Sequence, residues 1–446
     1  MNITAKSFSG KFGTSDDIGD IIHVHVSSPY MPITDPGENM LMFVIDISGS
    51  MEESLPMVKS SLLAFRDAIL DRNPSEMEKM EPQTRDLLFR NAIKVRLIVF
   101  SNVAEEVWSS DSDQDKYFED VVINLRTVAM TNMGDALKLA FRLTDPELFT
   151  WIVVMTDGES NEGPCRTAGS FHKLIVTSQP NNTKIITLGY GNRFDPEVLN
   201  RVGNFAYISD KEMIPVVLGN IVEEVMTATQ FNCVISVDDE IQPTELTEET
   251  VIVPAGENEI IMGEVIVGDR ILGTICMGED YDYVYLVHGR NILPNLGRYK
   301  SITVQYTDIN TKHFSEQTVT IEHTKCIPPD NIRELYFRAE KKRIIYNLYK
   351  IINNNSGNID EDLKNIKNKL ETWNDPIADP HKDHIVKMLD DLNIGSHVHR
   401  ASTALNIATG NSYTDSTRRS KYLDTTLSAT IHYMESPLIN TNNTNF

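Results

Sequence analysis

Oxygen-bearing side chains are concentrated in three short motifs of this sequence. DISGS at 46–50 offers one carboxylate and two hydroxyls, TNMGD at 131–135 offers a threonine hydroxyl, and TDGE at 156–159 offers a second carboxylate. These oxygens are hard ligands, of the kind that Mg²⁺ or Mn²⁺ prefers, and together they fill an octahedron only in part. The candidate metal ligands are Asp46, Ser48, Ser50, Thr131 and Asp157.

Two of the motifs directly follow apolar runs, at 40–45 and 151–155. Continuous apolar runs are typical of strands that are buried on both faces of a parallel sheet. Similar runs occur at 95–100 and 184–188, and amphipathic helical patterns occur at 135–143, 167–177, 196–202 and 213–227. This alternation predicts a doubly wound, mostly parallel α/β domain, in which the turns at the carboxyl ends of the strands hold the ligand.

Beyond residue 230 the hydrophobic period changes to two, as in Phe231, Cys233, Ile235 and Val237. Short alternating stretches separated by turn residues predict an antiparallel β-sandwich. The segment 21–27 alternates in the same way and has no partner nearby in the sequence. We therefore expect it to join the sandwich, so that the α/β domain is inserted between two sandwich strands.

The remaining segments differ in composition. Amphipathic helical patterns begin after the two prolines at 328 and 329, and the end of the chain is rich in Ser, Thr and Asn. The predicted organisation comprises a flexible arm at 1–19, the first sandwich strand at 20–38, the α/β domain at 39–230, the β-sandwich at 231–326, an α-helical region at 327–395 and a polar, largely irregular tail at 396–446.

The stretches DISGSM, TNMGDAL and TDGES, in this order and spacing, resemble the metal-ion-dependent adhesion site of von Willebrand factor type A domains. The resemblance covers about 40–230. It implies that Ser48, Ser50 and Thr131 coordinate the metal directly, and that Asp46 and Asp157 act directly or through water. Gly49 would allow the tight backbone turn between the two serines.

The segments on either side of the α/β domain are similar to the sandwich-plus-helix module of type A proteins in plant RING ubiquitin ligases and their viral and protist relatives. A RING needs paired Cys and His ligands for zinc. This chain has four scattered cysteines, Cys165, Cys233, Cys276 and Cys326. None of them forms a C-x-x-C pair, so ligase chemistry is not implied and reduced thiols are expected.

The charge of the chain restricts its partners. Sixty-four acidic and 41 basic residues give a net charge of −23, which disfavours binding to nucleic acids or anionic membranes. No apolar run reaches the roughly 18–20 residues that cross a bilayer, and the first residues lack a signal-peptide pattern. We therefore expect an intracellular, cytoplasmic protein without membrane insertion. The sequence leaves its oligomeric state open.

These observations favour a metal-dependent protein–protein interaction module. The open metal position would accept an Asp or Glu carboxylate from a partner protein. A scaffold, coat or virion subunit, in which the metal only orders the loops, is the alternative. A Mg²⁺-dependent hydrolase with an Asp46 nucleophile is disfavoured, because Ser48 occupies the place where such enzymes usually carry a second acid. We expect a protein that is not an enzyme.

Overall fold

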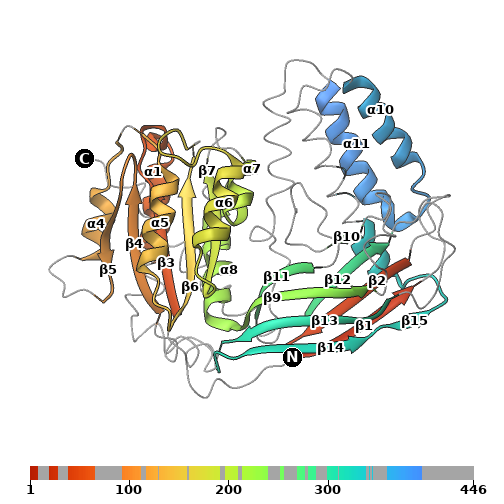
Figure 1. Ribbon diagram of the computed structural model, residues 1–446. Helices are drawn as coiled ribbons and strands as arrows, with labels where there is room; N and C mark the ends of the chain where they lie inside the picture. The colour runs from red at the N-terminus through yellow and green to blue at the C-terminus, as the bar shows by residue number, and fades with distance from the viewer. Residues whose placement is uncertain are drawn as a thin grey trace, which may run out of the picture.

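The computed structural model describes residues 1–8, 20–28, 39–65, 93–111, 117–128, 130–157, 160–190, 196–208, 213–239, 252–255, 269–276, 280–287, 299–309, 311–337, 341, 344 and 359–393. The chain forms a mostly parallel α/β domain inserted in a β-sandwich and followed by helices (Figure 1). The predicted tail at 396–446 and most of the predicted arm lie outside the described residues. None of the described helices has the length and apolar character needed to cross a bilayer.

The α/β domain is built on a six-stranded sheet with the order β5-β4-β3-β6-β7-β8. Its strands are β3 (Asn39–Asp46), β4 (Ile93–Phe100), β5 (Ala104–Ser109), β6 (Phe149–Thr156), β7 (Thr183–Tyr190) and β8 (Asn204–Ile208). Neighbouring strands are parallel, except that β5 pairs antiparallel with β4 at one edge. Every residue of β3 and β6 is buried, which explains their continuous apolar sequences.

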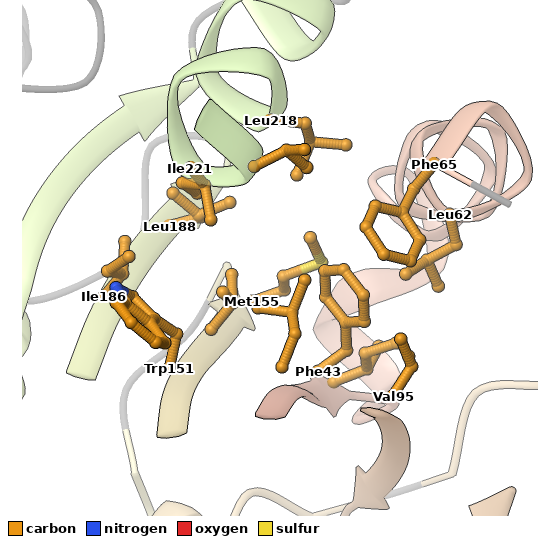
Figure 2. Packing of buried hydrophobic residues seen from close by; sticks show 14 of the residues in the cluster. Phe43, Leu62, Phe65, Val95, Trp151, Met155, Ile186, Leu188, Leu218 and Ile221 are labelled. Atoms are coloured by element: carbon orange, nitrogen blue, oxygen red, sulfur yellow. The ribbon is translucent and has the colours of Figure 1, made fainter. Parts of the chain in front are cut away.

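Helices cover both faces of this sheet (Figure 1). The helices are η1 (Gly49–Glu52), α1 (Leu55–Phe65), α4 (Phe118–Asn124), α5 (Met133–Leu143), α6 (Ala168–Ser178), α7 (Pro196–Val202) and α8 (Met213–Thr227). Residues of α1, α4 and α8 share a core with one face, and residues of α5, α6 and α7 share a core with the other. Figure 2 shows the first core, where the Phe43 ring packs edge-on against Phe65 at a centroid distance of 4.8 Å.

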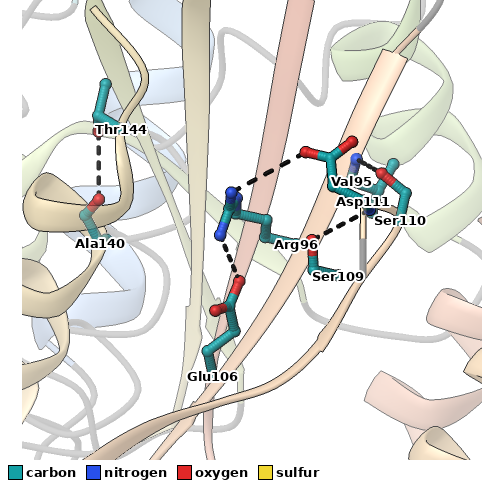
Figure 3. Close-up of polar contacts among 8 residues, drawn as sticks. All are labelled: Val95, Arg96, Glu106, Ser109, Ser110, Asp111, Ala140 and Thr144. Atoms are coloured by element: carbon teal, nitrogen blue, oxygen red, sulfur yellow. Dashed lines mark hydrogen bonds and ion pairs between the residues drawn. The ribbon is translucent and has the colours of Figure 1, made fainter. Parts of the chain in front are cut away.

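An ion pair fastens β5 to the rest of the sheet (Figure 3). Arg96 of β4 donates from Nη1 to Glu106 Oε1 of β5 at 2.7 Å, and its Nη2 lies 3.9 Å from Asp111 Oδ2. The Ser110 hydroxyl accepts the Val95 N–H at 3.0 Å. These contacts fix the antiparallel β4–β5 hairpin, and therefore the turn at 101–103 that connects its strands.

The sandwich consists of two sheets with the strand orders β10-β12-β2-β1-β15 and β11-β9-β13-β14. Its strands are β1 (Asn2–Phe8), β2 (Asp20–Ser27), β9 (Ala228–Asp239), β10 (Ile252–Ala255), β11 (Asp269–Cys276), β12 (Asp280–Val287), β13 (Tyr299–Asp308), β14 (Phe314–Thr320) and β15 (Glu322–Thr324). β2 pairs antiparallel with β1 and β12, so the predicted insertion of the α/β domain is confirmed. All described pairs are antiparallel except β1 with β15, which is parallel.

The prediction of a flexible arm at 1–19 is wrong for residues 2–8. Asn2–Phe8 is strand β1, which precedes β2 in the chain and pairs with it over seven residues. Ile3 and Ala5 face the sandwich core, together with Ile22 and Val24. The strand is polar on its other face and carries few apolar residues, so its stability comes from its two neighbouring strands.

The junction between the α/β domain and the sandwich is closely packed. α8 ends at Thr227 and β9 begins at the next residue. Phe231 of β9 packs against Phe149 and Trp151 of the α/β core, at centroid distances of 5.0 and 5.5 Å. The Ser28 and Thr229 hydroxyls lie 3.1 Å apart, so the end of β2 lies beside the start of β9.

The helical region contains α10 (Ile359–Glu371), the short η4 (Pro376–Ala378) and α11 (Asp379–Asn393). It is tied to the segment that follows the sandwich. Arg333 forms an ion pair with Asp375, and the rings of Phe337 and Trp373 lie 5.2 Å apart. The helices thus extend the predicted sandwich-plus-helix module.

Candidate metal centre

Two of the three motifs meet at the carboxyl edge of the central strands. β3 and β6 are parallel neighbours, and Ile45 is in register with Met155. Asp46 ends β3 and Asp157 directly follows β6, so the parallel pairing places both carboxylates at one edge of the sheet. This is the edge at which ligands bind in open α/β sheets.

Asp46 is fully buried, and both of its carboxylate oxygens are held. Oδ1 accepts the Ser48 N–H at 2.8 Å, and Oδ2 accepts the Thr156 hydroxyl at 2.6 Å. Burial raises the pKa of the Asp46 carboxyl to about 6, because an ionised carboxylate loses its hydration there; the nearby Asp157 adds to this rise. The two hydrogen bonds oppose the rise without cancelling it.

A chain of hydroxyls joins the two motifs. Ser48 Oγ lies 3.0 Å from Ser50 Oγ, and Ser50 Oγ donates to Asp157 Oδ1 at 2.8 Å. Ser48 and Asp157 are buried. The structure therefore brings together four of the five predicted ligands.

The fifth predicted ligand, Thr131, is positioned through its backbone. Its N–H donates to Asn161 Oδ1 at 3.0 Å, and its carbonyl accepts the Asn161 and Glu162 N–H groups, each at 3.0 Å. The loop that precedes it lies against DISGS, since Val128 forms an isolated parallel bridge with Ser48. The buried Thr131 side chain makes no hydrogen bond to the other four predicted ligands in the described structure.

Asn161 is a positioning residue that the sequence analysis missed. It lies in the loop after the TDGE motif and contacts Thr131 through both its side chain and its backbone. The two residues are 30 positions apart, and nothing in the sequence of either loop indicates the contact.

Further contacts hold the threonine loop to its neighbours. Asn132 caps α5 by accepting the Asp135 N–H at 3.2 Å, and its Nδ2 donates to the Asn102 carbonyl at 3.1 Å. Asp135 Oδ2 accepts the Ala104 N–H at 3.1 Å. Gly163 has a φ of +76°, and a Cβ at this position would lie 2.4 Å from Asn132 Oδ1. The loop can pass this close only because the residue is glycine.

The donor set fits a small hard cation. Hydroxyls supply much of the set, and no cluster of three or more His, Cys, Asp or Glu side chains that could hold a metal occurs among the residues that the structure describes. Among the residues that the structure describes, no Lys or Arg side chain lowers the pKa of Asp46. A divalent cation is therefore a suitable counter-charge for a carboxylate that burial otherwise disfavours.

Comparisons with known proteins bear on the same region. The family model of the von Willebrand factor type A domain matches residues 41–214. A solved structure described as von Willebrand factor type A from Catenulispora acidiphila is 14% identical, with a TM-score of 0.57, over 92% of this chain and 96% of that chain. The ArnB paralog VWA2 from Sulfolobus acidocaldarius is 15% identical, with a TM-score of 0.52 and the same two coverages. A search of curated proteins finds no match.

Proposed function

Residues 41–214 of this chain form a von Willebrand factor type A domain, and we propose that this domain binds a partner protein through a metal ion. Mg²⁺ or Mn²⁺ would be held by Asp46, Ser48, Ser50, Thr131 and Asp157. When bound, the cation supplies an electrophilic centre that an Asp or Glu carboxylate of the partner can complete. Type A domains often mediate protein–protein interactions through such a site.

The observation that carries the proposal is the environment of Asp46. Its carboxylate is fully buried, accepts hydrogen bonds on both oxygens, and has a pKa raised to about 6. Near pH 7 the group is mostly ionised at the expense of stability. Such an arrangement is unfavourable for a purely structural aspartate and favourable for one that binds a cation.

The hydrogen bonds of the loops favour partner binding over the scaffold alternative. In that alternative the metal only orders the loops. Thr131 is already clamped by Asn161 and Glu162, and the 101–104 turn is held by Asn132 and Asp135. Because these bonds are independent of a metal, a cation that merely ordered the loops would add little.

We also propose that the domain is not an enzyme. Ser48 stands two residues after Asp46, in the place where an aspartyl phosphatase would need an acid or base, and a serine cannot serve as one near neutral pH. Its hydroxyl is hydrogen-bonded to the Ser50 hydroxyl. We therefore expect Ser48 to act as a metal ligand and not as a general acid.

Two measurements, made one after the other, test the proposal. The first is Mn²⁺ binding, followed by electron paramagnetic resonance, with Mg²⁺ as the competitor. The second is capture of partner proteins in Mg²⁺ and in EDTA, read by mass spectrometry. We expect Mn²⁺ to bind at one site, Mg²⁺ to displace it, and the captured partners to be lost in EDTA.

The variants are Asp46→Asn and a charge-matched control, Asp120→Asn. Asp120 is exposed on α4 and lies outside the predicted site. Asp46→Asn should abolish metal binding and metal-dependent capture, whereas Asp120→Asn should preserve both. Partners that survive EDTA and the Asp46→Asn change at full strength would instead support the scaffold function.

A further inference from the structure

The outermost strand β14 has a neighbouring strand on one side only, among the residues that the structure describes. Figure 1 shows β14 along the lower border of its sheet. Alternate residues of the strand are exposed, and Phe314 at its start has an exposed fraction of 67%. A strand of seven residues with an open side is a template on which another strand can pair.

Hydrogen bonds to β13 determine which backbone groups of β14 point outward. The Asp308 N–H donates to the His313 carbonyl at 3.0 Å, so these two residues form a hydrogen-bonded pair at the turn. In an antiparallel ladder such pairs alternate with pairs that are not hydrogen-bonded, and the register of β13 with β14 is unbroken. Every second residue of β14 therefore directs its N–H and C=O groups away from the sheet. These residues are Phe314, Glu316, Thr318 and Thr320.

The other edge strands of the described sheets have features that obstruct pairing. β8, β10 and β15 contain only five, four and three residues, and β10 includes Pro254. β5 and β11 have register shifts, which interrupt the row of backbone groups. β14 has no proline, no lysine and no register shift. Since proteins usually protect exposed strand edges by such features, the open edge of β14 indicates a binding surface.

We propose that β14 pairs with β14 of a second copy of this chain, antiparallel and around a two-fold axis. The sheet β11-β9-β13-β14 of each copy would then continue into that of the other. The inference goes beyond the proposed function and is independent of it, because the contact lies in the sandwich and involves no residue of the candidate metal centre.

The sequence of β14 is complementary to itself in one register. With the axis at Gln317, Phe314 lies opposite Thr320 of the partner subunit, and Glu316 lies opposite Thr318 of the partner subunit. Every outward backbone group of the strand is then used, with two hydrogen bonds in each such pair. An axis at Glu316 would place two like charges directly opposite each other, which is destabilising. An axis at Thr318 would leave Phe314 without a partner in β14.

The charges at this edge should weaken the dimer without preventing it. Glu316 is the one ionisable residue of β14, and Gln305 Nε2 of β13 donates to its Oε2 at 2.8 Å, on the side away from the second copy. The charged residues just before and after the strand, Lys312 and Glu322, are each paired within the chain. The two Glu316 carboxylates would be diagonal neighbours, and each copy has a net charge of −23. Because salt screens this repulsion, added salt should strengthen the dimer.

Sedimentation velocity of the full chain over a range of concentrations is the first test. A reducing agent is present, so that the exposed Cys326 forms no disulfide. We expect a reversible equilibrium of monomer and dimer that shifts toward the dimer as salt is added and is unchanged by EDTA. A chain that stays monomeric at every concentration and salt would overturn the inference.

The variants Thr318→Glu and Thr318→Lys test the register. Residue 318 of each copy would face Glu316 of the partner subunit, so each substitution creates two cross-strand charge pairs. Thr318→Glu should weaken the dimer about tenfold at low salt, and Thr318→Lys should strengthen it about fivefold. The controls of equal charge are Val176→Glu and Val176→Lys, at a side chain of α6 with an exposed fraction of 71%. They should leave the dimer affinity unchanged.

A disulfide tests the position of the axis without a change of charge. Residue 317 would lie opposite its own counterpart in a pair that is not hydrogen-bonded, where the two Cα atoms are about 4.5 Å apart and within disulfide range. Gln317→Cys in a Cys326→Ser background should therefore form a covalent dimer on mild oxidation. Thr318→Cys in the same background is the control. This position is more exposed, but about 7–8 Å separate it from its counterpart, so it should stay largely reduced.

The outcomes separate this inference from other contacts and from the proposed function. If a dimer forms but is indifferent to Thr318→Glu, and Thr318→Cys cross-links as readily as Gln317→Cys, another surface joins the copies and the inference is wrong. If the dimer dissociates in EDTA, the copies are joined through a metal, and the inference is also wrong. A failure of Mn²⁺ to bind would refute the proposed function and leave the dimer unaffected.

Discussion

Replacing Asp46 by Asn should stabilise the metal-free protein near neutral pH. The pKa of the carboxyl rises from its ordinary value of 3.8 to about 6 in the fold. A tenfold change in an acid dissociation constant corresponds to ~1.4 kcal/mol, so holding this carboxylate ionised at pH 7 destabilises the fold by about 3 kcal/mol. Asn carries no charge but loses one acceptor, which opposes the gain by roughly 1 kcal/mol. The expected net gain is about 2 kcal/mol.

The free energy of unfolding of the metal-free wild type should change with pH in a definite direction. Between about pH 4 and pH 6 the folded wild type binds more protons at Asp46 than the unfolded chain does. The stability of the metal-free wild type should therefore fall as pH rises through this window, whereas the amide introduced by the substitution does not titrate. The advantage of Asp46→Asn should be large at pH 7 and absent near pH 4.

Urea unfolding in EDTA measures this difference through the fluorescence of Trp151. Its side chain is fully buried in the α/β core, and its Nε1 donates to Glu224 at 2.8 Å. Trp108→Phe and Trp373→Phe in both proteins remove the other two signals. With Mg²⁺ at ~100 times its Kd the order should reverse, since wild type alone gains about 2.7 kcal/mol. A metal-free Asp46→Asn protein that is less stable than wild type at every pH would refute the reasoning.

Three further predictions concern the same domain. The Mg²⁺ affinity measured by calorimetry should fall as the pH drops below about 6, because protons compete with the cation for Asp46; a flat profile would exclude this residue as a ligand. Asn161→Ala should weaken Mn²⁺ binding about tenfold or more by releasing Thr131, whereas the control Asn124→Ala on α4 should leave it unchanged. Equal affinities of the Asn161→Ala variant and the wild type would show that Asn161 does not position Thr131. Phe231→Ala should destabilise the α/β domain by about 3–5 kcal/mol, because the ring fills the space against Phe149 and Trp151. The Trp151 unfolding assay measures this loss. A loss below ~1 kcal/mol would show that the junction is not part of the core.

The features of the fold that depend on neighbouring residues in the sequence could be predicted. The buried strands β3 and β6 follow from their apolar runs, and the alternation at 21–27 is enough to place β2 in the sandwich. β1 could not be predicted in this way. Its sequence NITAKSF has little apolar content, and its stability depends on β2 and on β15 at the far end of the sandwich.

The candidate site likewise has features that the sequence predicts and features that only the folded chain shows. Asp46, Ser48 and Ser50 lie within one turn after a strand, so their proximity is evident from the sequence. The clamp on Thr131 joins two loops whose residues are 30 positions apart, and only the folded chain brings Asn161 to it. The pKa of Asp46 depends on burial, which a motif does not encode.

The two connections of the α/β domain also determine how the molecule responds to a pulling force. The domain is joined to β2 on one side and to β9 on the other, and these strands belong to different sheets of the sandwich. Each is an interior strand with a partner on both sides. Tension applied at the metal centre would act along the length of both strands, so that rows of backbone hydrogen bonds would be loaded together in shear and not opened one at a time.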